Sequence, residues 1–323
     1  MTAFGSPYLA IDLGTATTRV AGGRSGICLR PSVAPQGPAL NRGVIVNLNA
    51  AIEVLRPMIQ RRRRARIGRL RVLACAPSDV TALERNMVRS CILEAGAFSV
   101  IVVPEPLAAA VGSGIDIGGK YAKLLVDFGD GVTDCALIRD GQIADSVAER
   151  VGCSNLRAVI RNFVWKTAGL TIAEAEAERL LRKIGLTRQG EERCRGHVNG
   201  QPAAGRIQVA ALQEELWPVV TRMLAPLKTL LKEIPASIAV EVIEDGIFLT
   251  GGGALLPGLR ERVAAFSAIH TQIVPDPVAA VICGARRMLP IAAKLDLWNG
   301  WGTYQRAFLS PETRHVVGRS RAS

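Results

Sequence analysis

The hydrophobic positions of the chain alternate between short apolar runs of strand character and longer stretches with helical spacing. Two of the apolar runs continue in the same way, with an Asp-x-Gly turn and a second strand that starts at once. They span residues 8–23 (YLAIDLGTATTRVAGG) and 124–143 (LLVDFGDGVTDCALIRDGQI). Two such strand–turn–strand units, each with an Asp at the end of its first strand, predict two similar half-molecules that face one ligand.

The remaining pattern predicts a mixed α/β chain. Helical spacing predicts a helix over 50–62, and a long helix is expected from 77 to 96, where a glycine fits the C′ position. Helices are also expected over 151–168 and 170–184, the second opened by a capping box from Thr171 to Glu174. Further expectations are strands at 27–29, 70–76, 100–103, 207–209 and 245–250, a small-residue helix at 107–114, a polar hairpin region at 187–205, a helix at 210–232 that tolerates or kinks at Pro218 and Pro226, and a closing helix that ends near 289.

Composition narrows the class of protein. A chain of 323 residues exceeds the size at which one core usually keeps growing, so two domains are expected. No apolar run approaches the roughly 20 residues of a membrane span, and the first residues lack the pattern of a signal peptide. Seven scattered cysteines without a CxxC pair argue against a disulfide framework or zinc site, and for a reducing cytosol. The net charge of +12 indicates an anionic partner without naming it.

The most basic segment carries seven arginines between Arg61 and Arg71. One interpretation is a solvated helix end and loop. Another is a surface patch for anionic lipid headgroups at the membrane, where each basic residue contributes about 1 kcal/mol. Nucleic acid is the third interpretation and is not expected as a partner, because no aromatic residues alternate with the arginines to stack on bases.

The first strand–turn–strand unit has the chemistry of an anion site. A dinucleotide-binding fingerprint would need GxGxxG followed by a helix, whereas here the turn leads into a β-branched strand. Backbone N–H groups and the hydroxyls of Thr15, Thr17 and Thr18 would form a nest suited to phosphates. Asp12 at its base is placed to hold Mg²⁺ through water. For this segment alone, an ordinary hairpin with a solvated Asp is the alternative.

Two later segments also carry candidate chemistry. Glu105 lies between two prolines where a strand meets the small-residue helix, and a carboxylate there can orient a water in phosphoryl transfer. Its alternative role is that of a simple turn acid. Three glycines at 251–253, between a strand and a helix, allow the backbone to approach a flat or charged ligand closely.

Four motifs, in this order, resemble the signature of the actin, sugar kinase and chaperone ATPase superfamily, with 278–289 as its fifth part. Within that superfamily the chain most resembles the MreB family, the bacterial actins that guide rod-shaped wall growth. The motifs are Asp12-Leu-Gly-Thr-Ala-Thr-Thr, Pro104-Glu-Pro-Leu-Ala-Ala-Ala, Asp127-Phe-Gly-Asp-Gly-Val-Thr-Asp and Leu249-Thr-Gly-Gly-Gly-Ala, and the match extends through Arg30-Pro-Ser-Val-Ala, Cys75-Ala-Pro-Ser-Asp and Ala175-Glu-Ala-Glu-Arg.

The resemblance implies an α/β actin-like ATPase fold, with two related ribonuclease H-like domains around a nucleotide cleft. Domain I would comprise 1–123 plus 284–323, with its subdomain IB largely missing, and domain II 124–283, with a subdomain at about 160–240. ATP and Mg²⁺ would bind between them, and hydrolysis would couple closure to head-to-tail filament assembly. The protein would act in cell-shape determination as a cytoplasmic, membrane-apposed cytoskeletal protein, assembling with itself or with a full-length relative.

The resemblance also assigns roles by position. Asp12, Glu105 and Thr133 would be catalytic, with Glu105 orienting the attacking water. Asp12, through water, and Asp127 would hold the metal. The nucleotide would be bound by the two hairpin turns, by Glu178 at the ribose or adenine, and by the glycine segment: Gly14, Thr15, Ala16, Thr17, Gly129, Asp130, Gly131, Glu178, Gly251, Gly252, Gly253 and Ala254.

The chain departs from the family pattern at four places. Asp130 stands where a glycine is usual, Val132 where a threonine is usual, and Leu181 where a lysine is expected. A carboxylate about 4 Å from a γ-phosphate charge would cost roughly 4 kcal/mol at an effective dielectric near 20, so Asp130 predicts weak ATP binding. Between Ala34 and Gly43 the family inserts a small subdomain and this chain has a short loop, which argues against ordinary polymerisation.

Two alternative functions stay open. The first is a degenerate scaffold of the same fold that binds nucleotide weakly or never hydrolyses it, so that ATPase activity is weak or absent. The second is a small-molecule kinase of the same superfamily. The shortness of the chain speaks against the kinase, because no obvious insertions build a substrate pocket.

Overall fold

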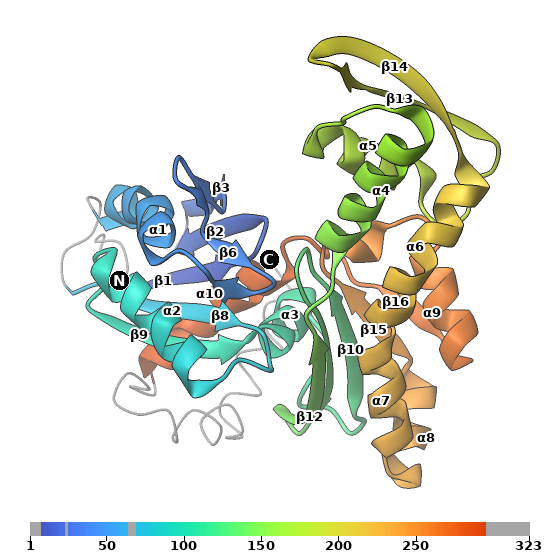
Figure 1. Cartoon of the computed structure of the whole chain (residues 1–323). Coiled ribbons are helices and arrows are strands. Elements are labelled where there is room, and N and C mark those ends of the chain that lie inside the picture. The colour runs from blue at the N-terminus through green and yellow to red at the C-terminus, as the bar shows by residue number, and fades with distance from the viewer. Residues whose placement is uncertain (1–7, 23–24, 64–68, 295–323) are drawn as a thin grey trace.

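The computed structural model describes residues 8–22, 25–63 and 69–294, which form two lobes (Figure 1). Each lobe contains a five-stranded sheet, with the strand orders β3-β2-β1-β8-β9 and β12-β11-β10-β15-β16. In both sheets the first three strands along the chain form an antiparallel meander, and two later strands continue the sheet in parallel. The prediction of two similar half-molecules is confirmed.

The first sheet separates two helical layers. Leu9 and Ile11 of β1 face α1 and α2, whereas Ala10 between them faces α3 and α10, as the two-residue period of a strand requires. These elements are β1 (Tyr8–Leu13), β2 (Thr17–Gly22), β3 (Ser25–Pro31), α1 (Leu48–Arg63), β8 (Arg71–Ala76), α2 (Ala82–Glu94), β9 (Ser99–Pro104), α3 (Glu105–Ser113) and α10 (Ala280–Lys294).

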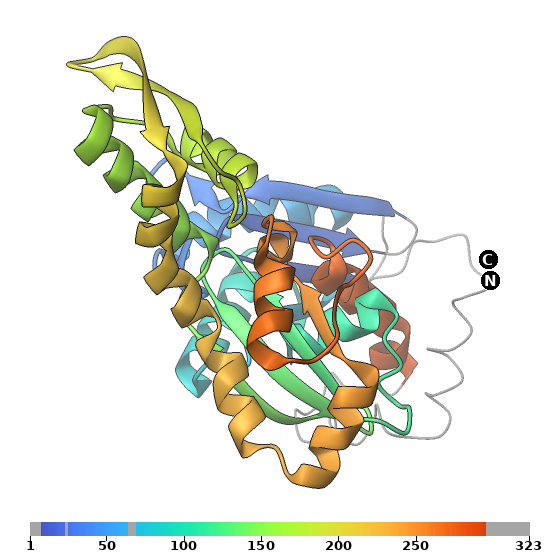
Figure 2. The ribbon, with the colours of Figure 1, turned by 90° about the vertical axis from the view of Figure 1, so that its right-hand side faces the viewer.

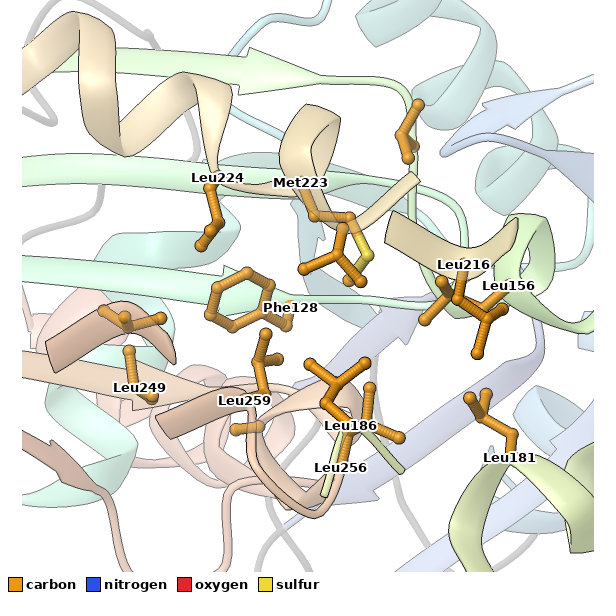
Figure 3. Close-up of a cluster of buried hydrophobic side chains, with 14 of the residues drawn as sticks. Phe128, Leu156, Leu181, Leu186, Leu216, Met223, Leu224, Leu249, Leu256 and Leu259 are labelled. Atoms are coloured by element: carbon orange, nitrogen blue, oxygen red, sulfur yellow. The ribbon is translucent and has the colours of Figure 1, made fainter. Parts of the chain in front are cut away.

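The second lobe is built around Phe128, which is fully buried at the end of β10. Figure 3 shows its ring among Leu249, Leu259 and Met223, so that one side chain joins two strands of the sheet to two helices. Figure 2 shows α6 and α7 following one another along this lobe, with the β13–β14 hairpin at its far end. The strands are β10 (Lys123–Phe128), β11 (Thr133–Arg139), β12 (Gln142–Glu149), β13 (Glu191–Val198), β14 (Gln201–Gln208), β15 (Ile247–Thr250) and β16 (Thr271–Ile273), and the helices are α4 (Cys153–Ala168), α5 (Glu174–Ile184), α6 (Val209–Met223), α7 (Ala225–Glu233), α8 (Ala236–Asp245), the short 3-10 helix η1 (Gly252–Leu255) and α9 (Leu259–Ser267).

Helices α3 and α10 cross with their backbones in contact. A Cβ atom added to Gly112 would lie 1.8 Å from the carbonyl oxygen of Ala280, and one added to Gly284 would lie 1.7 Å from that of Ala108. Only glycine fits at either position. The same hydrophobic cluster includes Leu125 of the second sheet, so this helix pair lies between the two lobes. The close crossing explains why the helix expected at 107–114 is rich in small residues.

The loop between β3 and α1 is short and folds back on itself. We call residues 32–47 the strap. It contains two small hairpins, β4 (Val33–Ala34) with β5 (Gly37–Pro38) and β6 (Leu40–Asn41) with β7 (Val44–Ile45). The Ser32 amide donates to the Ala16 carbonyl at 3.0 Å, which ties the strap to the first hairpin turn.

Three helix predictions were wrong in their boundaries. The helix expected from 77 begins at Ala82, because Thr81 and Glu84 form a capping box there and Ser78 is held by the second lobe. The capping box expected at Thr171 does not form, since the Thr171 backbone pairs with His197 as an isolated β-bridge. Helix α5 instead starts at Glu174.

The helix expected over 210–232 is two helices, α6 and α7, which meet at Leu224. Pro226 lies in the first turn of α7. Backbone N–H groups in a first turn have no partner within the helix, so a proline there removes no helical hydrogen bond. Pro218 stays inside α6. Part of the arginine-rich segment, residues 64–68, and the tail from 295 lie outside the described residues. No helix among the described residues is both long and apolar enough to cross a membrane.

Candidate functional site

A cavity of about 440 Å³ opens between the two lobes. Its wall includes both hairpin turns, the start of α3, the facing sides of α4 and α5, and the glycine segment after β15. Segments far apart in the sequence therefore meet in one space. Of the residues singled out from the sequence, the wall contains Asp12, Gly14, Thr15, Ala16, Thr17, Glu105, Asp127, Gly129, Asp130, Gly131, Glu178, Gly251, Gly252 and Gly253.

The Thr18 hydroxyl, expected in the phosphate nest, is fully buried against the Ser32 hydroxyl at 2.9 Å and does not line the cavity. Two residues assigned by the resemblance, Thr133 and Ala254, do not reach this wall either. The Thr133 hydroxyl is fully buried and donates to the Val151 carbonyl at 2.9 Å, so it braces the start of β11 against the segment before α4. Ala254 is also buried, inside the core of the second lobe. Both residues support the site from behind and do not line it.

The two hairpin turns touch each other at the base of the cavity. A Cβ atom on Gly131 would lie 2.5 Å from the Thr15 hydroxyl and 2.7 Å from the Cα atom of Arg42. The Thr15 hydroxyl in turn accepts a hydrogen bond from the Gly43 amide at 2.9 Å. Glycine at position 131 is therefore required by the approach of the other lobe and of the strap.

Asp12 is paired with a residue that the sequence motifs did not indicate. Asp12 and Arg19 are direct partners in the β1–β2 register, and Arg19 Nη1 lies 3.0 Å from Asp12 Oδ2. The Asp12 side chain is 6% exposed and that of Arg19 is 19% exposed. Burial raises the pKa of Asp12, and Arg19 opposes that effect. Strand alternation could have revealed the pair, since Arg19 shares a face of β2 with Thr17.

Other carboxyl groups converge close to Asp12. Burial, together with the charges of neighbouring carboxylates, raises the pKa of Glu105 well above its usual range. The same two effects raise the pKa of Asp127 to about 7. Burial raises the pKa of Asp134 to about 7, although its carboxylate accepts hydrogen bonds from the hydroxyl and the amide of Ser78 at 2.5 and 2.7 Å. A carboxyl group with a pKa near 7 can accept or release a proton at neutral pH.

Arg157 of α4 joins the second hairpin turn to α5. Its Nη2 atom lies 2.8 Å from Asp130 Oδ1, its Nη1 atom 3.2 Å from Glu178 Oε2, and its Nε atom is bonded to Glu174. Arg182 holds the other oxygen of Glu178 at 2.5 Å. Asp130 is thus one member of an ion-pair network and not an isolated charge. No local sequence pattern predicts this network, because its members come from separate elements.

The three glycines after β15 have different reasons to be glycine. Gly251 has φ +81°, and a Cβ atom there would lie 2.3 Å from Asp127 Oδ1. A Cβ atom on Gly253 would lie 2.8 Å from that of Phe128. Gly252 has no atom within 4 Å of its Cβ position and lines the cavity. Close packing on β10 explains two of the glycines, and only Gly252 presents open space to a ligand.

The chain is similar to known proteins of one family. The MreB/Mbl protein family model matches residues 36–296. The cell shape-determining protein MreB of Escherichia coli (strain K12) is 31% identical over 236 residues, covering 71% of this chain and 67% of that protein. The cell shape-determining protein Mbl of Bacillus subtilis (strain 168) is 27% identical over 263 residues, covering 79% of each chain.

Solved structures share the fold over almost the whole described chain. MreB5 of Spiroplasma citri bound to ADP superposes with a TM-score of 0.81 at 25% identity, covering 91% of this chain and 98% of that one. The MamK double helical filament superposes with a TM-score of 0.75 at 17% identity, covering 88% of this chain and 98% of that one. At this identity the similarity is evidence for a shared fold only. The predicted actin-like fold is therefore confirmed. By its family-model match and its relatives, the chain belongs to the MreB/Mbl family.

Proposed function

We propose that this protein is an actin-family cytoskeletal protein of cell-shape determination that binds an adenine nucleotide in the cavity between its lobes. One observation carries the proposal: both hairpin turns, Glu105 and Gly252 line one cavity of about 440 Å³. That volume lies in the range of small-molecule sites. MreB5 of Spiroplasma citri, with the same fold, has been solved with ADP and with AMPPNP.

Different residues on the cavity wall bind different parts of the nucleotide. In this proposal the turns at 14–17 and 129–131 bind the phosphates through backbone N–H groups, which form anion nests in such turns. Glu178 and Gly252 lie at the ribose and base, and Glu105 orients the water that attacks the terminal phosphate. Thr133 acts indirectly, by holding the second turn in place. These assignments rest on the lining of the cavity and on the family motifs.

The domain division follows the two sheets. We propose that domain I comprises 1–123 plus 284–323 and domain II comprises 124–283. The packing of α10 against β1, β2 and β8 supports a return of the chain to the first lobe. Residues from 160 to 240 then form an extension of the second lobe, which includes the β13–β14 hairpin (Figure 2).

We propose that Asp12 does not hold the Mg²⁺ ion that the motifs predict. The Asp12 carboxylate already accepts from Arg19 at 3.0 Å, and a divalent cation on that carboxylate would face a guanidinium of like charge.

The ion pair between Arg19 and Asp12 favours a second candidate function. A scaffold of this fold that binds nucleotide and does not hydrolyse it would tolerate the Arg19–Asp12 pair and the Arg157 network. In either case we propose assembly with copies of itself or with a full-length relative, at the cytoplasmic membrane surface. MamK, a protein of the same fold, is described as a double helical filament. The arginine-rich segment at 61–71 would contact the lipid.

Equilibrium titration with ADP and with ATP tests nucleotide binding, and the chain offers a matched pair of variants. Gly252→Leu places a side chain in the cavity, and Gly26→Leu makes the same change at a glycine that also has open space around its Cβ position and does not line the cavity. We expect Gly252→Leu to abolish binding and Gly26→Leu to bind as the unmodified protein does. Equal binding by both variants would place the nucleotide elsewhere.

A further inference from the structure

Arg19 is a cation on the wall of the cavity with a single ion-pair partner in the part of the chain that the structure describes. Its Nη1 atom pairs with Asp12, and its guanidinium carries five N–H donors in all. The other two arginines on the wall are held differently. Arg157 is shared among three carboxylates, and Arg182 is 66% exposed and bound to Glu178.

The position of Arg19 is set by the first hairpin. It lies on β2 two residues after Thr17, and the two-residue period of a strand places both side chains on the face that lines the cavity. The turn whose amides would bind phosphates thus continues directly into a guanidinium. A planar fork of N–H donors matches two phosphate oxygens at once, which an ammonium group cannot do.

We propose that Arg19 binds the nucleotide phosphates in place of a divalent cation, so that the cavity binds nucleoside di- and triphosphates without metal. The inference rests on the proposed nucleotide site. Arg19 keeps one N–H group on Asp12, which fixes its orientation, and directs others to the phosphate. Arg19 of strand β2 then supplies, beside Asp12, the positive charge that a metal ion would otherwise supply.

Asp127 and Glu105 offer an alternative way to neutralise the phosphate charge, by holding a divalent cation. Both carboxyl groups line the cavity close to Asp12, and in the part of the chain that the structure describes neither forms an ion pair. If they hold a divalent cation, nucleotide binding will require it whatever Arg19 does. The two accounts therefore differ in one measurable quantity, the ratio of the affinities for ADP with Mg²⁺ and with EDTA.

Isothermal titration with ADP in the two buffers measures that ratio. For the unmodified protein we expect affinities equal within about threefold, and for Arg19→Leu a loss of about tenfold or more in EDTA, part of which Mg²⁺ restores because Asp12 is freed. Arg139→Leu removes an arginine that is paired with Glu241 and does not line the cavity, and should behave as the unmodified protein.

A second variant controls for misfolding of Arg19→Leu. Arg19→Leu leaves Asp12 buried without its partner, whereas the double variant Asp12→Asn with Arg19→Leu leaves no unpaired charge. We expect this variant to bind ADP weakly and to gain nothing from Mg²⁺. Binding by the unmodified protein that is about tenfold or more tighter with Mg²⁺, or unchanged binding by the double variant in EDTA, would overturn the inference. No ADP binding in either buffer would overturn the proposed function as well.

Discussion

Asp130 and Arg157 form an ion pair on the wall of the cavity, with 2.8 Å between Oδ1 and Nη2. The sequence alone predicts a free carboxylate there that repels a terminal phosphate. The structure instead gives Asp130 a partner that also holds Glu174 and Glu178. The pairing reduces the repulsion expected from Asp130, and it prevents Arg157 from acting as a free phosphate ligand.

Replacing Asp130 tests this balance. In Asp130→Gly, Arg157 loses one competing carboxylate and the cavity wall loses a negative charge, so affinity for ATP should rise. We expect a gain of about three- to tenfold, which is smaller than an unpaired carboxylate would give. Titration with ATP measures it, and Asp145→Gly, a change at a carboxylate that does not line the cavity, is the control. Unchanged affinity in Asp130→Gly would mean that the network leaves the phosphates unaffected.

The stability of the protein without nucleotide should fall as pH rises toward neutral. Burial raises the pKa of Asp127 from 3.8 to about 7, so between these values the folded state holds a proton that the unfolded chain has released. The free energy of unfolding therefore decreases with pH across this window, by an amount on the order of 4 kcal/mol for the whole shift. Denaturation with urea near pH 5 and near pH 8 samples the upper part of this window, in which about 3 kcal/mol of the decrease falls.

The Asp127→Asn variant is the control for this pH dependence. An amide does not titrate, so the difference in unfolding free energy between the two pH values should shrink. Asp134, whose pKa burial also raises to about 7, should retain its own share of the effect. An identical pH profile in Asp127→Asn would contradict the assignment.

The crossing of α3 and α10 should not tolerate a single added methyl group. In Gly284→Ala the new Cβ atom would lie 1.7 Å from the Ala108 carbonyl oxygen, so the two helices must separate. Overpacking of this kind costs about 3 kcal/mol or more in unfolding free energy. Chemical denaturation measures the loss, and Gly26→Ala, with open space around its Cβ position, should cost much less. Equal effects of the two substitutions would be incompatible with the close crossing.

Arg150 should help to hold the lobes together. It follows β12 of the second lobe and pairs with Asp79 at 2.9 Å and with Glu84 of α2 at 3.2 Å in the first. Since these are partly exposed pairs, Arg150→Ala should lower the unfolding free energy by only about 1 kcal/mol, while limited proteolysis between the lobes becomes faster. Arg260→Ala, which breaks an exposed pair with the adjacent Glu261, should change neither.

The local sequence patterns correctly predicted the two hairpins whose turns line the cavity. An Asp-x-Gly turn between two apolar strands depends on neighbours in the sequence, and both hairpins formed as expected. The long-range pairs were missed, because nothing local says that Arg157 will meet Asp130 or that Ser78 will be held by Asp134. That second pair also explains why α2 starts later than its sequence suggests.

The glycine segment shows the same limit. From the sequence, three glycines predict close approach of a ligand, and the structure gives Gly251 and Gly253 a closer neighbour in β10. A turn next to a buried aromatic residue needs glycine whether or not a ligand is present. Of the three glycines, Gly252 alone has open space around its Cβ position, and that space arises only when the chain is folded.

Amide hydrogen exchange with and without ADP reports directly which segments of the protein contact the nucleotide. We expect slower exchange at 14–17, at 129–131 and in η1 when ADP is present, with little change in the β13–β14 hairpin. All three segments line the cavity between the lobes. Protection confined to one hairpin turn, or located outside the cavity, would contradict an adenine nucleotide held between the two lobes.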